Sequence, residues 1–282
     1  MATGDDPYVY PGTNVLRNIP DIRDAAALKA YEYERSNLRA REIREQPLPE
    51  RFDLAHLKTL HQQLFQDVYE WSGKTREIDI AKGGSMFALP QFIESEAKRL
   101  SADLARENNL RNLDKAQFVE RLAQHYGDWN ALHPFREGNG RATREFLGQI
   151  ARGAGYELDQ TRIDNNKQQW NDAARDSMNG HMQPIEAILA YAVRPMRAHA
   201  FEHLPKDEAL RKHPELADAF AGLNAIESAL KKQFGDKPNV IQNYTVRARE
   251  TIVKQLDAGT VPKLAQVRQA PIEPPTKAEP RR

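Results

Sequence analysis

Apolar side chains recur three or four positions apart through most of this chain, which is the spacing of an amphipathic helix. The run after Asp53 is the clearest example, because an aspartate at that place commonly caps a helix by accepting a backbone N–H. Similar patterns cover residues 28–43, 90–107 and 113–132, and another begins at Gly140. The pattern therefore predicts a mainly α fold.

One segment departs from the helical period. Residues 75–80 place isoleucine at alternate positions, as a strand does, and Gly83-Gly84 then supply a turn before an apolar return over residues 86–89. We therefore expect one short β-hairpin, with strands over 75–80 and 86–89, inside the helical fold.

The pattern changes again near residue 200. Helical spacing runs from residue 207 to 234 with an interruption at Pro214, and it resumes over residues 244–256. The last stretch is rich in proline and charge, so we expect it to be disordered. We divide the chain into a main domain (1–200), a helical C-terminal extension (201–268) and a tail (269–282).

Composition excludes several classes of protein. Hydrophobic residues make up 40% and charged residues 29%, with a mean hydropathy of −0.75, as in soluble globular proteins. No apolar run is long enough for a membrane span and no secretory signal is visible, so we expect a cytoplasmic protein without a membrane partner. The absence of cysteine excludes disulfides and thiolate sites. A net charge of +1 gives no reason to expect direct binding of nucleic acid.

The stretch His133–Arg144 carries the most chemistry. Glycines on both sides of Asn139 allow backbone amides to form a concave nest, and the helix that begins at Gly140 adds a helix N-terminus that favours an anion. Arg141 and Arg144 lie three residues apart on this helix and so share a face. Two guanidinium groups beside an amide nest suit a polyphosphate better than a single carboxylate.

Two further residues of the stretch supply reactive groups. Glu137 precedes the nest and can hold Mg²⁺, which prefers one carboxylate together with phosphate oxygens and water. His133 can take a proton at neutral pH. Each residue alone has an ordinary structural explanation, but their order and spacing together favour a phosphate site. We interpret His125 as a structural or surface histidine, because no zinc-type spacing accompanies it.

The stretch matches the signature of the Fic family, His-x-Phe-x-[Asp/Glu]-Gly-Asn-Gly-Arg-x-x-Arg, at every defined position. Residues 10–16 also resemble the opening of many bacterial members, and residues 81–87 resemble the hairpin, or flap, that precedes the signature. The resemblance covers about residues 8–200. It implies a Fic-type helical core with a short β-hairpin flap, followed here by a helical extension.

The resemblance implies a protein adenylyltransferase that transfers AMP from ATP to a Tyr, Thr or Ser hydroxyl of a target protein. In that reading His133 deprotonates the hydroxyl and Glu137 holds Mg²⁺. The implied ATP- and phosphate-binding residues are Gly138, Asn139, Gly140, Arg141 and Arg144. The implied residues of the flap that dock the target are Lys82, Gly83 and Phe87.

Many Fic enzymes also carry an inhibitory helix, [Ser/Thr]-x-x-x-Glu-[Gly/Asn], whose glutamate pairs with the second signature arginine, here Arg144. We find no full match: Glu107-Asn108 has Asp103 at the Ser/Thr position and lies between flap and signature. The resemblance then implies a small antitoxin that supplies the glutamate in trans, with this chain as the toxin of a bacterial toxin–antitoxin pair.

Three alternatives remain open at this stage. A secreted type IV effector would modify host proteins in another cell. A Doc-like phosphotransferase would lack glycine after the acidic residue and the following Gly-Arg, whereas this chain keeps Gly138, Gly140 and Arg141. A non-catalytic nucleotide-binding module would need neither His133 nor Glu137. The sequence leaves open the target, the nucleotide base, the role of the extension and the oligomeric state.

Overall fold

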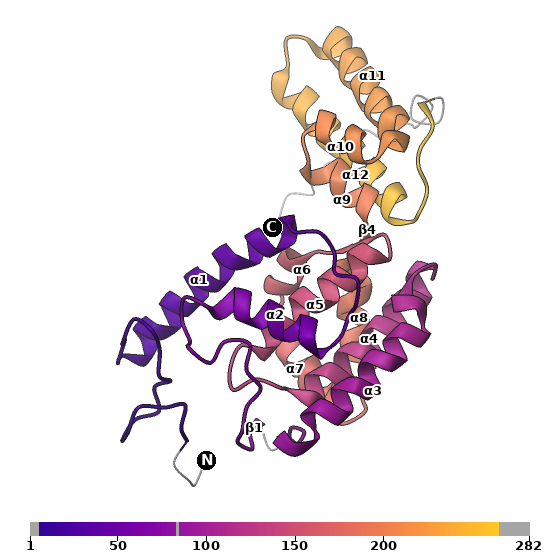
Figure 1. Cartoon of the computed structure of the whole chain (residues 1–282). Coiled ribbons are helices and arrows are strands. Elements are labelled where there is room, and N and C mark those ends of the chain that lie inside the picture. Colours follow the sequence, from indigo (N-terminus) through magenta and orange to yellow (C-terminus); the bar gives the residue numbers. More distant parts are fainter. Residues whose placement is uncertain (1–5, 83–84, 265–282) are drawn as a thin grey trace, which may run out of the picture. The chain divides into compact units, whose positions relative to one another are not determined.

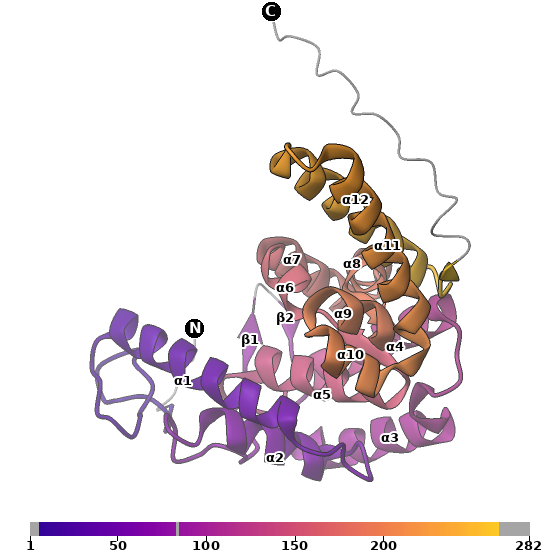
Figure 2. The ribbon, with the colours of Figure 1, turned by 90° about the horizontal axis from the view of Figure 1, so that it is seen from above.

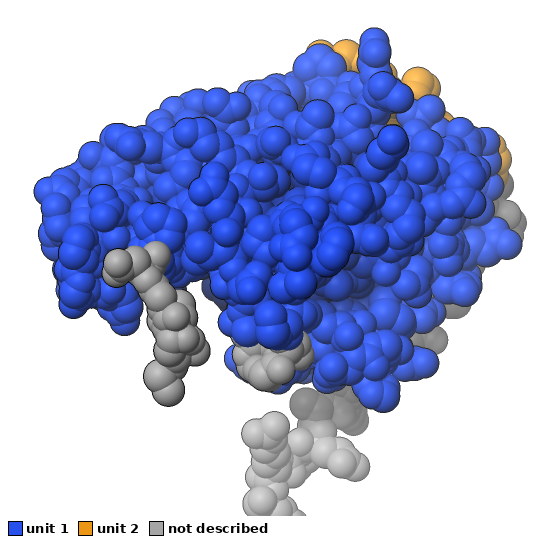
Figure 3. Space-filling view, turned by 60° about the horizontal axis from the view of Figure 1, so that its bottom comes forward, with its two compact units in different colours: residues 1–193 blue, residues 194–282 orange. Residues whose placement is uncertain are grey.

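The structure is a computed structural model of the 282-residue chain, and it describes residues 6–82 and 85–264. Helices predominate in these residues, as predicted (Figure 1). The chain forms two compact units, residues 1–193 and 194–282, coloured separately in Figure 3. This division falls before residue 200, because Ala198, Ala200 and Phe201 pack in the core of the second unit. Within the described ranges, no helix has the length and apolar character needed to cross a bilayer.

The first unit is built mainly of helices joined by short loops. They are α1 (Ala25–Glu45), α2 (Leu54–Phe65), α3 (Ile93–Arg106), α4 (Lys115–Leu132), α5 (Asn139–Gly153), α6 (Gln160–Asp164), α7 (Lys167–Met178) and α8 (Gln183–Ala192), with 3₁₀ turns η1 (Pro90–Phe92) and η2 (Asn108–Leu110). Strand β1 (Ala81–Lys82) pairs with β2 (Ser85–Met86), and β3 (Tyr156–Leu158) is a further short strand of this unit. Strand β4 (Val193–Pro195) spans the boundary between the two units.

Helix α5 lies in the core of the first unit, where Phe146, Leu147 and Ile150 are fully buried. It packs on α2 and α4, and α2 packs in turn on α1 (Figure 2). The N-terminal half of the signature lies in the loop between α4 and α5, and its last residues open α5. The core therefore fixes the signature from both ends.

The predicted helix ends near the signature are confirmed. Asp53 caps α2 by accepting the N–H of His56 at 3.0 Å. Helix α4 ends at Leu132, and His133 follows as its C-cap in the left-handed conformation (φ 45°, ψ 61°). Proline at position 134 explains the break, because it disfavours the α-helical region for the residue before it. Helix α5 begins at Asn139, one residue before the predicted start.

The predicted hairpin is present but its strands are shorter: the first lies later than predicted, at Ala81–Lys82, and the second starts one residue earlier, at Ser85–Met86. Ala81 pairs with Met86 and Lys82 with Ser85 in antiparallel register. The prediction of a strand over residues 75–80 was wrong, since these residues have irregular backbone. The guanidinium of Arg76 donates a hydrogen bond to the carbonyl of Ile78 at 2.7 Å. In a strand, this carbonyl would accept a backbone N–H of the neighbouring strand. The predicted turn at 83–84 and the predicted disorder of 269–282 lie outside the described residues.

The second unit is a small helical body with its own core. Its elements are α9 (Met196–His203), α10 (Lys206–Lys212), the 3₁₀ turn η3 (Pro214–Leu216), α11 (Ala217–Phe234) and α12 (Pro238–Asp257). The predicted interruption at Pro214 is present. Helix α12 starts before the predicted residue 244, because proline is tolerated in the first turn of a helix. Ring contacts such as Phe201 with Phe220, whose centroids lie 4.6 Å apart, hold this core together.

Candidate active site

The loop that carries the first half of the signature is held in place by contacts of Phe135 and Asn139. Phe135 is fully buried, and its ring stacks on that of His61 with centroids 3.8 Å apart. Asn139 accepts the N–H of Phe135 at 2.8 Å and donates to its carbonyl at 2.7 Å. Asn139, one of the predicted phosphate-binding residues, thus uses its side chain to hold the loop. Only its backbone N–H, at the start of α5, is left to bind a phosphate. The loop is therefore rigid before any ligand arrives.

His133 is held in a defined orientation. Its Nδ1 lies 3.1 Å from the carbonyl oxygen of Asn130, which can only accept a hydrogen bond. In the neutral ring Nδ1 therefore carries the proton and Nε2 is the basic nitrogen. The ring of Phe87 stacks on the imidazole with a centroid distance of 3.7 Å and an interplanar angle of 14°. The imidazole of His133 thus has a fixed tautomer and a fixed plane.

The start of α5 depends on two glycines in different ways. Gly138 has φ +82°, and a Cβ there would lie 2.4 Å from two ring atoms of Phe65, so the position requires glycine. Its N–H donates to Oε1 of Glu137 at 2.9 Å. A Cβ on Gly140 would meet nothing within 4 Å. The N–H groups of Asn139 and Gly140 belong to the first helical turn, where no intrahelical acceptor exists, so they can serve an anion.

Arg141 is anchored by helix α1. Its guanidinium donates to Oγ of Ser36 at 3.0 Å and to Oε1 of Glu32, and it lies over the ring of Phe65, 4.6 Å from the centroid. Glu32 is buried, and its second oxygen accepts the hydroxyl of Tyr69. Sequence reasoning missed Glu32 and Ser36, which lie more than a hundred residues from their partner and belong to no motif.

Arg141 and Arg144 line the same cavity of ≈ 250 Å³, together with residues of α1 and α6. Arg144 donates to Oδ1 of Asp164 at 2.8 Å. Four arginines line the cavity, against two carboxylates of the lining and Glu32, which binds Arg141, so the cavity carries positive charge and suits an anion. Its charged lining residues are Arg41, Arg44, Arg141, Arg144, Glu145 and Asp164.

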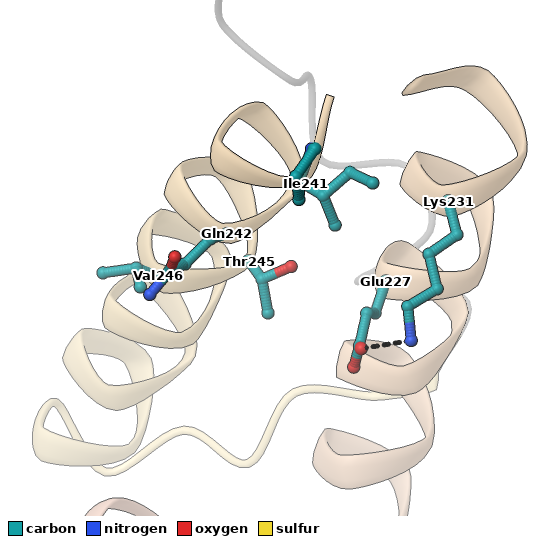
Figure 4. A pocket seen from close by; sticks show the side chains of 7 residues that line it. Glu227, Lys231, Ile241, Gln242, Thr245 and Val246 are labelled. Carbon is teal, nitrogen blue, oxygen red and sulfur yellow. Dashed lines mark ion pairs between the residues drawn. The ribbon is translucent and has the colours of Figure 1, made fainter. Parts of the chain in front are cut away.

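A larger cavity of ≈ 340 Å³ lies within the second unit, between α11 and α12 (Figure 4). Its two charged residues, Glu227 and Lys231, neutralise each other at 2.7 Å, and Ile241 and Val246 add apolar surface. This lining therefore offers no net positive charge to attract a phosphate. The chemistry therefore favours the smaller cavity as the functional one.

Glu137 stands at the edge of the nest, with its side chain 47% exposed. Its Oε1 lies 3.8 Å from a guanidinium nitrogen of Arg141. In the described part of the chain, no group of three or more His, Asp and Glu side chains could hold a metal. A lone carboxylate next to a phosphate site fits Mg²⁺, which takes its other ligands from phosphate and water. His125, by contrast, is buried with Nε2 3.3 Å from Oε2 of Glu107, as a structural histidine would be.

The predicted flap residues are only partly accounted for. Lys82 is the last residue of β1, Phe87 follows β2, and Gly83 lies outside the described residues. Phe87 is buried against His133. The flap therefore ends at His133.

Sequence reasoning also missed His61, which binds the backbone of Glu137. Its Nε2 donates to the carbonyl of Glu137 at 2.9 Å, and its Nδ1 accepts the N–H of Gly73 at 2.9 Å. Both nitrogens serve backbone groups, so the ring must be neutral. Burial lowers the pKa of His61 to about 4. The only signal in the sequence was a histidine on the apolar face of α2.

His61 should make the first unit sensitive to acid. Because burial holds the folded-state pKa below the ordinary 6.5, the unfolded chain takes up this proton first as the pH falls. Stability is therefore complete above about pH 6.5 and is lost on going towards pH 4. We expect His61 to account for about 2–3 kcal/mol of the loss in unfolding free energy between pH 7 and 4.5.

Urea unfolding of wild type and His61→Gln at both pH values measures this contribution. The variant should be less stable at pH 7 but should lose less on acidification. His56, whose pKa burial also lowers, remains in both proteins and cancels in the comparison. Equal losses in the two proteins would contradict the assignment.

Comparisons with known proteins agree with this geometry. Residues 51–151 match the Fic/DOC family. The chain is 42% identical over 193 residues to the probable protein adenylyltransferase Fic of Escherichia coli K12, covering 68% of this chain and 94% of that protein. It is 43% identical over 185 residues to the protein adenylyltransferase VbhT of Bartonella schoenbuchensis, covering 66% of this chain but only 38% of VbhT.

Solved structures extend the likeness to the fold. BepC, a VirB-translocated effector of Bartonella tribocorum crystallised with bound AMPPNP, superimposes with a TM-score of 0.64 at 30% identity. The match covers 67% of this chain and 97% of that one. With its signature loop, hairpin and helical core in place, this chain belongs to the Fic/DOC family.

Proposed function

We propose that this chain is a protein adenylyltransferase, which transfers AMP from ATP to a hydroxyl side chain of a target protein. The observation that carries the proposal is the pairing of an oriented base, His133, with a positively charged cavity lined by both signature arginines. Relatives that share about two thirds of this chain at 42–43% identity bear the name protein adenylyltransferase.

The placement of the groups supports the following reaction. Nε2 of His133 takes the proton of the target hydroxyl, and the hydroxyl oxygen forms a bond to the α-phosphorus of ATP. The bond between the α-phosphorus and the bridging oxygen breaks, and pyrophosphate leaves with the negative charge. Arg141, Arg144 and the first amides of α5 stabilise that charge. The products are the AMP-modified protein, pyrophosphate and a proton.

Mg²⁺ fits this site through Glu137. The exposed carboxylate would hold the ion together with phosphate oxygens, and the ion would neutralise part of their charge. The target strand would lie along the flap by strand addition, at Lys82, Gly83 and Phe87. The contact between Phe87 and His133 supports that placement, because it brings the flap to the base.

For regulation, we propose that a small antitoxin supplies a glutamate to Arg144, and that the chain is the toxin of the pair. Arg144 lines the cavity beside α1, where a carboxylate in trans could replace a phosphate. A role as a secreted effector is the second candidate. It is favoured by the similarity to BepC, which is a translocated effector.

Incubation with α-³²P-ATP and, separately, γ-³²P-ATP in the presence of Mg²⁺ and a bacterial lysate tests the reaction. We expect protein labelling from the α label alone, since AMP retains only the α-phosphate. Labelling from the γ label alone would instead establish a phosphotransferase. Purified wild-type chain that binds ATP but labels nothing in bacterial or host lysates would favour a nucleotide-binding module.

A further inference from the structure

Arg76 lies outside the signature, yet it binds the segment that carries the catalytic histidine. Its side chain is 2% exposed. Nε donates to the carbonyl of His133 at 2.9 Å, and the terminal nitrogens donate to Ile78 at 2.7 Å and to Ala88. A longer contact of 3.5 Å reaches Leu132. Each of these acceptors is a backbone carbonyl.

These carbonyls come from three separate segments of the chain. Ile78 precedes β1, Ala88 follows β2, and His133 caps α4. The backbone continues the same connection, since the N–H of Arg76 donates to Pro134 at 2.9 Å and that of Ala88 to Ala131 at 3.1 Å. Arg76 therefore ties both ends of the flap to the turn that holds His133.

The chemistry of this contact requires a guanidinium. The N–H donors of arginine lie on three nitrogens of one plane and point in fixed, diverging directions, so they can reach several carbonyls at once. The three N–H donors of lysine all belong to one nitrogen. The last carbonyls of α4 carry the negative end of the helix dipole, which compensates the buried positive charge in part. Burial lowers the pKa of Arg76, because removal from water disfavours the charged form.

We propose that Arg76 is a positioning residue that holds the flap in register with His133, so that a target strand bound to the flap presents its hydroxyl to Nε2. The proposal rests on the adenylyltransferase function argued above. The cavity proposed for the phosphates is lined by residues of α1, α2, α5 and α6 and by none of the flap. Arg76 should therefore govern transfer to the protein and leave nucleotide affinity unchanged. A residue that merely stabilised the fold would change both.

The test compares Arg76→Lys with a matched control, Arg136→Lys. Arg136 lies in the same loop as His133, but its guanidinium pairs with Asp6 at 2.8 Å. Two quantities are measured: the affinity for AMPPNP by calorimetry, and AMP transfer from α-³²P-ATP to proteins of the lysate. For Arg76→Lys we expect unchanged affinity and about 10–100-fold slower transfer, the usual result of misplacing a reacting group by about 1 Å. The control should match wild type in both.

Transfer at the wild-type rate in Arg76→Lys would overturn the proposal, as would a parallel loss of AMPPNP affinity. A wild-type protein that binds AMPPNP and transfers nothing would instead contradict the proposed function.

Amide hydrogen exchange in wild type provides a measurement that needs no variant. The amides of Phe87 and Ala88 should be protected to the same degree as those at the end of α4. Much faster exchange at these two amides would mean that the flap is not held, and would also overturn the proposal.

Discussion

Replacing His133 with alanine should lower the rate of AMP transfer by about 10²–10⁴-fold, which is the usual contribution of a general base. The cavity lined by Arg141 and Arg144 remains, so the affinity for AMPPNP should stay close to that of wild type. The measurement is transfer from α-³²P-ATP, with the exposed His181→Ala as a control. If the chain is a toxin, its expression should arrest growth and the same substitution should relieve the arrest.

Transfer at the wild-type rate in His133→Ala would remove this residue as the base. Growth arrest that persists in the variant would separate toxicity from the chemistry of this site.

Replacing Gly138 with alanine should destabilise the first unit by about 2–5 kcal/mol. The positive φ costs an L-residue about 1–2 kcal/mol, and the methyl group would overlap Phe65, where overpacking adds about 1–3 kcal/mol. Chemical denaturation measures the loss as a lower midpoint. A free energy of unfolding within about 0.5 kcal/mol of that of wild type would contradict the geometry at Gly138.

Gly140→Ala is the matched control, because it adds the same methyl group two residues further along the chain, where there is open space. We expect its stability to equal or slightly exceed that of wild type, since alanine favours a helix over glycine by up to about 1 kcal/mol. If ATP lies against the first amides of α5, the same methyl group should nevertheless weaken AMPPNP binding. Stability and binding therefore respond to different glycines.

Local patterns in the sequence account for much of the fold. The apolar spacing after Asp53 and the proline after His133 each predicted a helix boundary that the structure confirms. Such features depend on residues within about one helical turn, which a sequence displays directly. The strand predicted over residues 75–80 failed, because a buried arginine there binds carbonyls that local alternation cannot reveal.

The sequence by itself determined the helical class, the family and the identity of the signature residues, since the order and spacing of His133, Glu137 and the two arginines are local. Only the tertiary structure decided what holds them. Glu32 reaches Arg141, His61 reaches the backbone of Glu137, and Arg76 reaches that of His133, each from another part of the chain. These partners are buried hydrogen-bonding groups whose contacts exist only after the core has brought distant segments together, so no spacing along the chain records them.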